Sequence, residues 1–199
     1  MKILYHHRIA SKDGQYVHVE ELIKALRAEG HELIVVGPKV AEEKEFGSEG
    51  GWVARLRSAL PKSIYELLEF AYNAVSYFKL RQAVAKYRPD CLYERFNLFL
   101  PAGVWISKRF NLPMLSEVNA PLYQERSRFG GLRLKNLALW SQRYVWRNAN
   151  FVLPVTEVLA DYVKETGVPD ERIEVVHNGI DLGRFAKSSD KAERKRKLG

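Results

Sequence analysis

At 199 residues, 46% of them hydrophobic, the chain has the size of one α/β domain and can bury a proper core. Its single cysteine, Cys91, excludes an intramolecular disulfide and fits a reducing compartment, and no apolar run approaches the roughly 20 residues that span a bilayer. The formal net charge of +8 indicates an acidic partner, which composition leaves open as nucleic acid, anionic lipid or a phosphorylated substrate.

The first 36 residues predict a strand, a loop, a helix and a second strand. Ile3–Tyr5 is a short apolar run of the kind found in parallel strands buried on both faces. After the loop, one helical stripe is formed by Val19, Leu22, Ile23 and Leu26. Gly30 suits the left-handed end of that helix, and Leu33–Val36 returns as a strand. This βαβ unit predicts one half of a Rossmann-like fold with a right-handed crossover.

The loop Arg8–Val17 is the first candidate site, because ligands of open α/β sheets bind beyond the carboxyl ends of the strands. Gly14 allows close approach of the backbone to a ligand, and the helix start after it offers free N–H groups to an anion. The three spaced glycines of the dinucleotide fingerprint are absent, which argues against a dehydrogenase. On this loop alone, a Gly14 that merely turns the chain is an equal alternative.

Strands and helices alternate through the rest of the chain. Further strands are predicted at Cys91–Tyr93, Pro113–Val118, Phe151–Val155 and Ile173–Val176. Further helices are predicted at residues 63–88, 98–110, 132–148 and 157–165, the last opened by Thr156. We therefore expect an α/β, doubly wound parallel sheet of at least six strands.

The helix from residue 63 follows a weaker helical pattern that begins at Trp52 and is interrupted near Pro61. Ser63 is its predicted N-cap. One apolar face continues along this helix through Ile64, Leu67, Leu68, Ala71, Val75 and Phe78.

Four segments together resemble a known family. They are Asp13–His18 with Gly30–Leu33, Arg88–Arg95, Ala149–Thr156, and His177–Asp181 with Phe185. Over nearly its whole length the chain resembles the N-terminal domain of the family 4 (group 1) glycosyltransferases of the GT-B fold. It departs from the family pattern where Asp13 replaces the first glycine of the usual pair, and where Ser116–Asn119 stands in place of a histidine found in many members.

The resemblance implies that residues 1–185 form the acceptor-side Rossmann-like domain and residues 186–199 begin the linker to a second domain that this chain lacks. That domain would bind most of the nucleotide-sugar and supply the main catalytic residues, so this chain alone is expected to be inactive. The complete protein would be a retaining, hexosyl-type transferase that uses a nucleotide diphosphate sugar and needs no metal or cofactor. We expect a saccharide or lipid-linked acceptor, a role in cell-surface polysaccharide or glycolipid synthesis, and a cytoplasmic location, peripheral to the inner face of the membrane.

The resemblance also assigns roles to individual residues. The donor-side loop comprises Gly14, Gln15 and His18, of which His18 could equally be a structural hydrogen-bonding residue. The acceptor-side cleft comprises Arg95, Glu117 and Asn119 at strand ends. The crossing to the second domain comprises Asn178, Gly179 and Asp181. His6 and His7 end the first strand, and we expect one of them to face the cleft.

Basic residues gather between positions 126 and 147 with aromatic residues among them. The basic set is Arg126, Arg128, Arg133, Lys135, Arg143 and Arg147. Such a stretch suits an anionic membrane surface or a lipid-diphosphate acceptor. The alternative is an ordinary amphipathic helix with a solvated basic face.

Rival functions remain open. A nucleic-acid-binding protein would explain the charge, but no module of that kind is evident, and we expect no nucleic-acid partner. A sugar-nucleotide epimerase of the same fold is the closer rival. A non-catalytic domain that binds an anionic ligand is the third.

Overall fold

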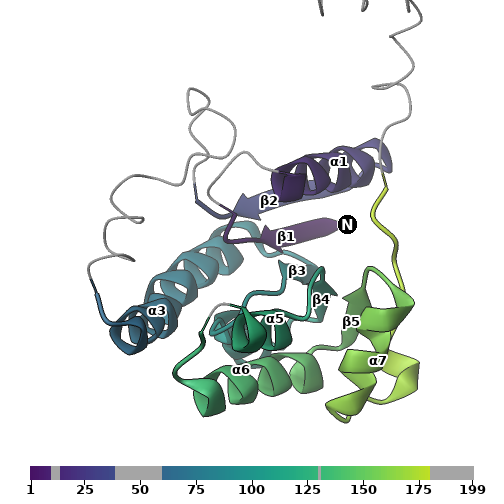
Figure 1. Ribbon diagram of the computed structural model, residues 1–199. Coiled ribbons are helices and arrows are strands. Elements are labelled where there is room, and N and C mark those ends of the chain that lie inside the picture. The colour runs from purple at the N-terminus through teal and green to yellow at the C-terminus, as the bar shows by residue number, and fades with distance from the viewer. Residues whose placement is uncertain (10–13, 39–59, 130, 180–199) are drawn as a thin grey trace, which may run out of the picture.

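The computed structural model describes residues 1–9, 14–38, 60–129 and 131–179. At its centre is a parallel sheet of five strands in the order β2-β1-β3-β4-β5 (Figure 1). The strands are β1 Lys2–His6, β2 Glu32–Val36, β3 Cys91–Arg95, β4 Met114–Val118 and β5 Phe151–Pro154. The helices are α1 Gly14–Ala28, α3 Lys62–Tyr87, α4 Ala102–Phe110, α5 Leu122–Arg128, α6 Lys135–Asn148 and α7 Glu157–Glu165, with a 3₁₀ turn at Asp170–Arg172. The predicted α/β, Rossmann-like parallel sheet is confirmed.

Helices cover both faces of the sheet. Alternate residues of each strand point to opposite sides, so apolar side chains on both faces need a covering layer. Tyr5 packs with Val19 of α1 on one face. Leu4, Leu92 and Met114 belong to the larger core that α3, α4, α6 and α7 share on the other. No helix in the described part of the chain is long and apolar enough to cross a bilayer.

Two predicted helix ends are confirmed. Gly30 has φ +80°, the left-handed conformation that a Cβ disfavours, just beyond the end of α1. The Thr156 hydroxyl caps α7 by accepting a hydrogen bond from the N–H of Leu159 at 3.2 Å.

The predicted sixth strand at Ile173–Val176 is wrong as a strand. Ile173 makes only an isolated parallel bridge with Val152. The N–H groups of Glu174 and Val176 donate to the carbonyls of Val152 and Pro154, so the segment does run beside β5. Glu174 and Val176 are exposed at the sheet edge, and the pairing ends there within the described residues.

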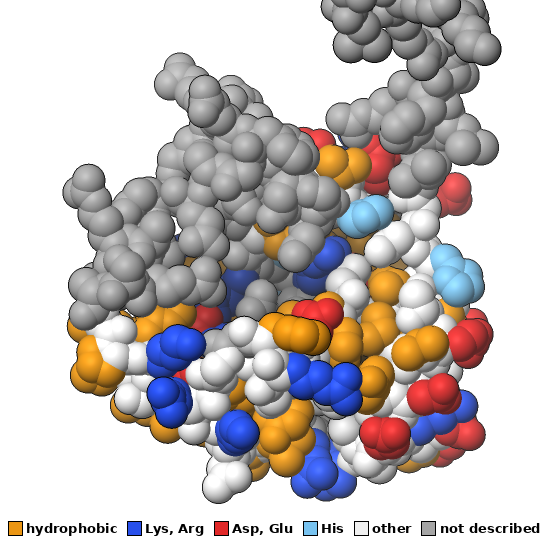
Figure 2. All heavy atoms as spheres, in the orientation of Figure 1, with side chains coloured by type: hydrophobic (Ala, Val, Ile, Leu, Met, Phe, Trp, Pro, Cys, Tyr) orange, Lys and Arg blue, Asp and Glu red, His pale blue; other side chains and the backbone are white. Residues whose placement is uncertain are grey.

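The expected pattern of α3 differs in two ways. Ser63 does not cap it: the helix begins at Lys62, after Pro61, with no side-chain cap. More importantly, Leu67, Leu68 and Phe78 of its apolar face are exposed, as Figure 2 indicates by the hydrophobic side chains at the left edge of the molecule, over α3. The buried side carries polar residues, among them Glu66 and Asn73. Most of the pattern predicted from Trp52 lies outside the described residues.

The other helix boundaries are close to those predicted. The helix expected from residue 98 begins at Ala102, because Phe99 takes a left-handed φ of +64° and holds the preceding turn in a loop. The helix expected from residue 132 begins at Lys135. The segment after β4, for which no helix is predicted above, contains the short helix α5.

Candidate functional site

The carboxyl ends of β1, β3 and β4 bring charged and aromatic side chains together at one edge of the sheet. In the register of the sheet, Tyr5 lies opposite Tyr93 and Arg95 lies opposite Glu117. All four therefore belong to the face of the sheet that α1 covers. This edge is where open α/β sheets bind their ligands.

Arg95 and Glu117 form a buried ion pair. The Arg95 guanidinium donates to Glu117 Oε1 over 2.7 Å, and both side chains are less than 8% exposed. The Asn119 amide donates to the same oxygen. The second oxygen, Oε2, is buried and has no hydrogen-bond partner among the described residues. The structure thus brings the three predicted acceptor-side residues into contact and leaves one carboxylate oxygen uncommitted.

Two tyrosines flank this pair. The rings of Tyr5 and Tyr93 stack with centroids 5.4 Å apart. Burial raises the pKa of both hydroxyls, and the Glu117 carboxylate beside them raises it further. Both tyrosines therefore stay protonated and can act only as neutral hydrogen-bonding groups. Sequence analysis missed them, because a tyrosine inside a buried strand looks like any other core residue.

On the other face of the sheet, His6 and Glu94 make a second buried pair. His6 Nδ1 lies 2.6 Å from Glu94 Oε2, and Glu94 is completely buried. The carboxylate fits against α4 only because residue 103 is glycine: a Cβ there would lie 2.2 Å from Glu94 Oε2.

His7 is also buried, with its Nδ1 accepting from the N–H of Ile9 at 3.2 Å. Burial, followed by the neighbouring positive charges of His6 and Arg95, lowers the pKa of His7 to about 4. The expectation that His6 or His7 faces the cleft is not met, because neither lines the cavity described next.

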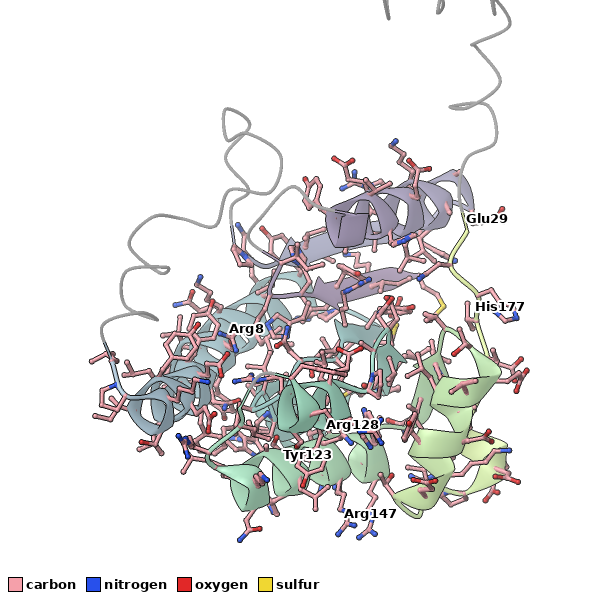
Figure 3. The ribbon with its side chains drawn as sticks, in the orientation of Figure 1. Arg8, Glu29, Tyr123, Arg128, Arg147 and His177 are labelled. Atoms are coloured by element: carbon pink, nitrogen blue, oxygen red, sulfur yellow. The ribbon has the colours of Figure 1, made fainter. Side chains whose placement is uncertain are left out.

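A cavity of about 420 Å³ opens beside the Arg95–Glu117 pair, between α1, the strand ends and the segment from Val176 to Gly179. Its lining includes His18, Tyr93, Glu117, His177, Asn178 and Gly179. Asn178 reaches back to Asn119, with 3.5 Å between the amide nitrogen and oxygen. Figure 3 shows His177 on this segment, where its Nδ1 lies 3.0 Å from the Val155 carbonyl.

The cavity therefore brings together residues from all three predicted groups: His18 of the donor side, Glu117 of the acceptor side, and Asn178 with Gly179 of the crossing. Gly14 and Gln15 are the first residues of α1. Asp181 lies outside the described residues. Among the described residues, no three His, Cys, Asp or Glu side chains gather closely enough to hold a metal ion.

The six predicted basic residues are not equivalent. Arg126 pairs with Glu69 of α3 at 2.8 Å and lies over the Phe99 ring. Arg147 donates to the Thr166 carbonyl beyond the end of α7. Arg128, Arg133, Lys135 and Arg143 are exposed. Figure 3 shows Arg128 on α5 and Arg147 at the far end of α6, so the set extends over two helices.

Comparison with known proteins shows the family to which the chain belongs. The model of Glycosyltransferase Family 4 matches residues 12–184. The chain belongs to this family of glycosyltransferases. A search of curated proteins found no match.

Solved structures share the fold at low sequence identity. Sucrose-phosphate synthase from Thermosynechococcus elongatus has a TM-score of 0.66 and 14% identity, covering 98% of this chain and 52% of that one. Anabaena HepE in complex with UDP-glucose has a TM-score of 0.61 and 16% identity, covering 100% and 50%. The UDP-GlcNAc 2-epimerase from Methanocaldococcus jannaschii has a TM-score of 0.51 and 13% identity, covering 89% and 45%. The chain thus spans about half the length of these proteins.

Proposed function

We propose that this chain is the acceptor-side half of a retaining glycosyltransferase that moves a hexosyl group from a nucleotide diphosphate sugar to an acceptor hydroxyl. The observation that carries the proposal is the Glu117 carboxylate, which is fixed by Arg95 and Asn119 through one oxygen and uncommitted through the other, at a cavity beyond the strand ends. Membership of the glycosyltransferase family supplies the reaction class.

Glu117 would bind the acceptor. A sugar hydroxyl that enters the cavity can donate its hydrogen to Glu117 Oε2, and a buried acceptor atom discriminates strongly in favour of a ligand that satisfies it. The Arg95 guanidinium holds the carboxylate in one position, so the hydroxyl is oriented as well as bound. Tyr93, whose hydroxyl keeps its proton, borders the same cavity.

The donor would lie across the start of α1. Gly14 and Gln15 are the first residues of this 15-residue helix, and the first N–H groups of a helix, which have no partner within it, can stabilise phosphate oxygens. They would oppose the negative charge that develops on the departing diphosphate. His18, one turn further on, lines the cavity from the same helix. The second domain of the complete protein would complete the nucleotide site.

We further propose a saccharide or lipid-linked acceptor of the kind consumed in cell-surface polysaccharide or glycolipid synthesis, on the cytoplasmic side of the membrane. The excess of positive charge suits an acceptor or a surface that carries phosphate. The donor sugar itself would be the only small molecule required besides the acceptor.

The test is an assay of the complete protein with a panel of nucleotide diphosphate sugars and saccharide or lipid-diphosphate acceptors, in which the product is characterised by NMR. We expect sugar transfer that depends on the acceptor, with the anomeric configuration of the donor kept. Conversion of the nucleotide-sugar to its epimer without any acceptor would contradict the proposal in favour of an epimerase. Binding without turnover of any donor would favour a non-catalytic domain.

A further inference from the structure

Helix α3 has an exposed apolar stripe. Its exposed side includes Ile64, Leu67, Leu68, Val75 and Phe78, between 45% and 57% exposed. These residues recur at i, i+3, i+4, i+11 and i+14, so they lie on one side of the helix, over a length of about 21 Å. A helix of a globular domain normally turns such a stripe to the core. We call these five residues the α3 face.

Hydrogen bonds prevent the helix from rotating to bury this face. Glu66 is 3% exposed and accepts from the backbone N–H groups of Arg133 and Leu134, at 3.0 and 2.6 Å. Asn73, equally buried, donates to the Phe99 carbonyl and accepts from the N–H of Ala102. Rotation of α3 would leave these groups unpaired in the interior, and each unpaired group costs about as much as the burial of one leucine contributes. The outward position of the α3 face is therefore built into the fold.

The exposed side of α3 carries cations and no carboxylate. Its two glutamates both point inward: Glu66 is buried, and Glu69 pairs with Arg126. The stripe continues past Phe78 into Lys79 and Lys86, both exposed. Arg133, also exposed, approaches α3 from its buried side, where its N–H binds Glu66, so it is not part of this face. In Figure 2, hydrophobic and basic side chains lie next to one another at the left of the molecule.

A tryptophan borders the same surface. Trp140 of α6 is 44% exposed and packs its ring against Phe70 of α3, with centroids 6.2 Å apart. Amphipathic rings of this kind favour the boundary between the headgroups and acyl chains of a bilayer. An apolar helix face bordered by Lys and Trp is the composition of a helix that lies in a membrane interface.

We propose that the α3 face docks on an anionic lipid bilayer, with Leu67 and Phe78 entering the acyl boundary and Lys79 and Lys86 contacting lipid phosphates. Charge decides between this occupant and the alternatives. A second copy of the chain would bring the same cations to the contact, whereas anionic lipid neutralises them. The inference goes beyond the proposed transfer reaction and does not depend on it.

The experiment is co-sedimentation of the 199-residue chain with vesicles of phosphatidylcholine alone or mixed with phosphatidylglycerol. We expect binding only to the mixed vesicles, weakening as salt is added. Leu67→Ser and Phe78→Ser should each weaken it on the order of tenfold, because each removes one large apolar side chain from the interface. Lys79→Glu and Lys86→Glu should each weaken it by at least about fivefold.

Two control substitutions on other helices test whether vesicle binding depends on the α3 face in particular. Val158→Ser changes an aliphatic residue on α7 that is even more exposed than Leu67 and Phe78, and Arg143→Glu makes the same charge reversal on α6. Both should bind mixed vesicles as the parent chain does. If instead Arg143→Glu abolishes binding while Lys79→Glu does not, the docking surface lies on α6 and the proposal is wrong.

Two further outcomes would overturn it. Failure of the parent chain to bind mixed vesicles, together with a dimer in sedimentation equilibrium that Leu67→Ser dissociates, would assign the face to a second copy. Failure to bind, together with a fall of several degrees in the Tm of both Leu67→Ser and Phe78→Ser, would assign it to another part of the same chain, such as residues 39–59. Circular dichroism of each variant checks that the comparison is between folded proteins.

Discussion

Arg95 and Glu117 stand opposite each other on neighbouring parallel strands and form a buried ion pair of 2.7 Å. Removing one member of such a pair leaves the other charge unpaired in the interior. We expect Arg95→Met to lower the free energy of unfolding by about 3–5 kcal/mol, measured by urea denaturation. The exposed pair of Lys164 and Asp170 is the control, and Lys164→Met should cost less than about 1 kcal/mol. Equal costs for the two changes would mean that the Arg95 pair is not buried in solution.

Gly103 provides a second test, of packing against Glu94. A Cβ at position 103 would lie 2.2 Å from Glu94 Oε2 and 2.6 Å from its Cδ. Since Glu94 is fully buried and held by His6, Gly103→Ala should cost about 1–3 kcal/mol of stability. Gly179→Ala, where no atom lies within 4 Å of the added Cβ, should cost little. In a Glu94→Ala background the cost of Gly103→Ala should shrink, and an unchanged cost in this double-mutant cycle would show that another contact is responsible.

His7 makes stability depend on pH. Its pKa falls from 6.5 to about 4 on folding, so between those values the unfolded chain binds more protons than the folded one. The contribution of His7 is present above pH 6.5 and is lost as pH falls toward 4, a change of about 3 kcal/mol. His7→Gln should flatten the curve of unfolding free energy against pH in this window. A parallel curve for the variant would assign the pH dependence to other groups.

The sequence predicts the central layer of this fold well. The β1–α1–β2 unit follows from a short apolar run, a helical stripe and Gly30, because each signal is local. The position of α3 could be predicted, but not its orientation. Periodicity shows which residues share a face of the helix. Which face of α3 turns to the core depends on the hydrogen bonds that Glu66 and Asn73 make with distant segments. The short helix α5 has too few turns to show a stripe.

Some contacts of the candidate site could also be predicted from the sequence, and others could not. Arg95, Glu117 and Asn119 could be placed together because they lie at or just beyond the carboxyl ends of strands, and these ends share one edge of the sheet. The stacking of Tyr5 on Tyr93 and the pairing of His6 with Glu94 depend on β1 lying beside β3 in a known register, and a single sequence does not contain that register.

The contact between Glu66 and the segment just before α6 can also be tested. Its carboxylate accepts from the N–H groups of Arg133 and Leu134, which would otherwise be unpaired beneath α3. Glu66→Ala should cost about 1–3 kcal/mol in urea unfolding, because two backbone donors lose their partner. Glu165→Ala, in the last turn of α7 and exposed, is the control and should change stability by less than about 0.5 kcal/mol. A cost for Glu66→Ala no larger than that of the control would contradict the contact.

Glu117→Gln tests the acceptor role in the complete protein with almost no change of shape. The amide can keep an oxygen toward Arg95, but it presents N–H groups where Oε2 would accept the hydrogen of a sugar hydroxyl. We expect the KM for the acceptor to rise on the order of tenfold or more, with the KM for the nucleotide-sugar nearly unchanged, because the donor would bind at the start of α1 and in the second domain. Glu174→Gln makes the same substitution at an exposed glutamate outside the cavity lining and should leave both constants as they are. A rise confined to the donor KM would move Glu117 to the donor side, and no change in either would remove it from the substrate site.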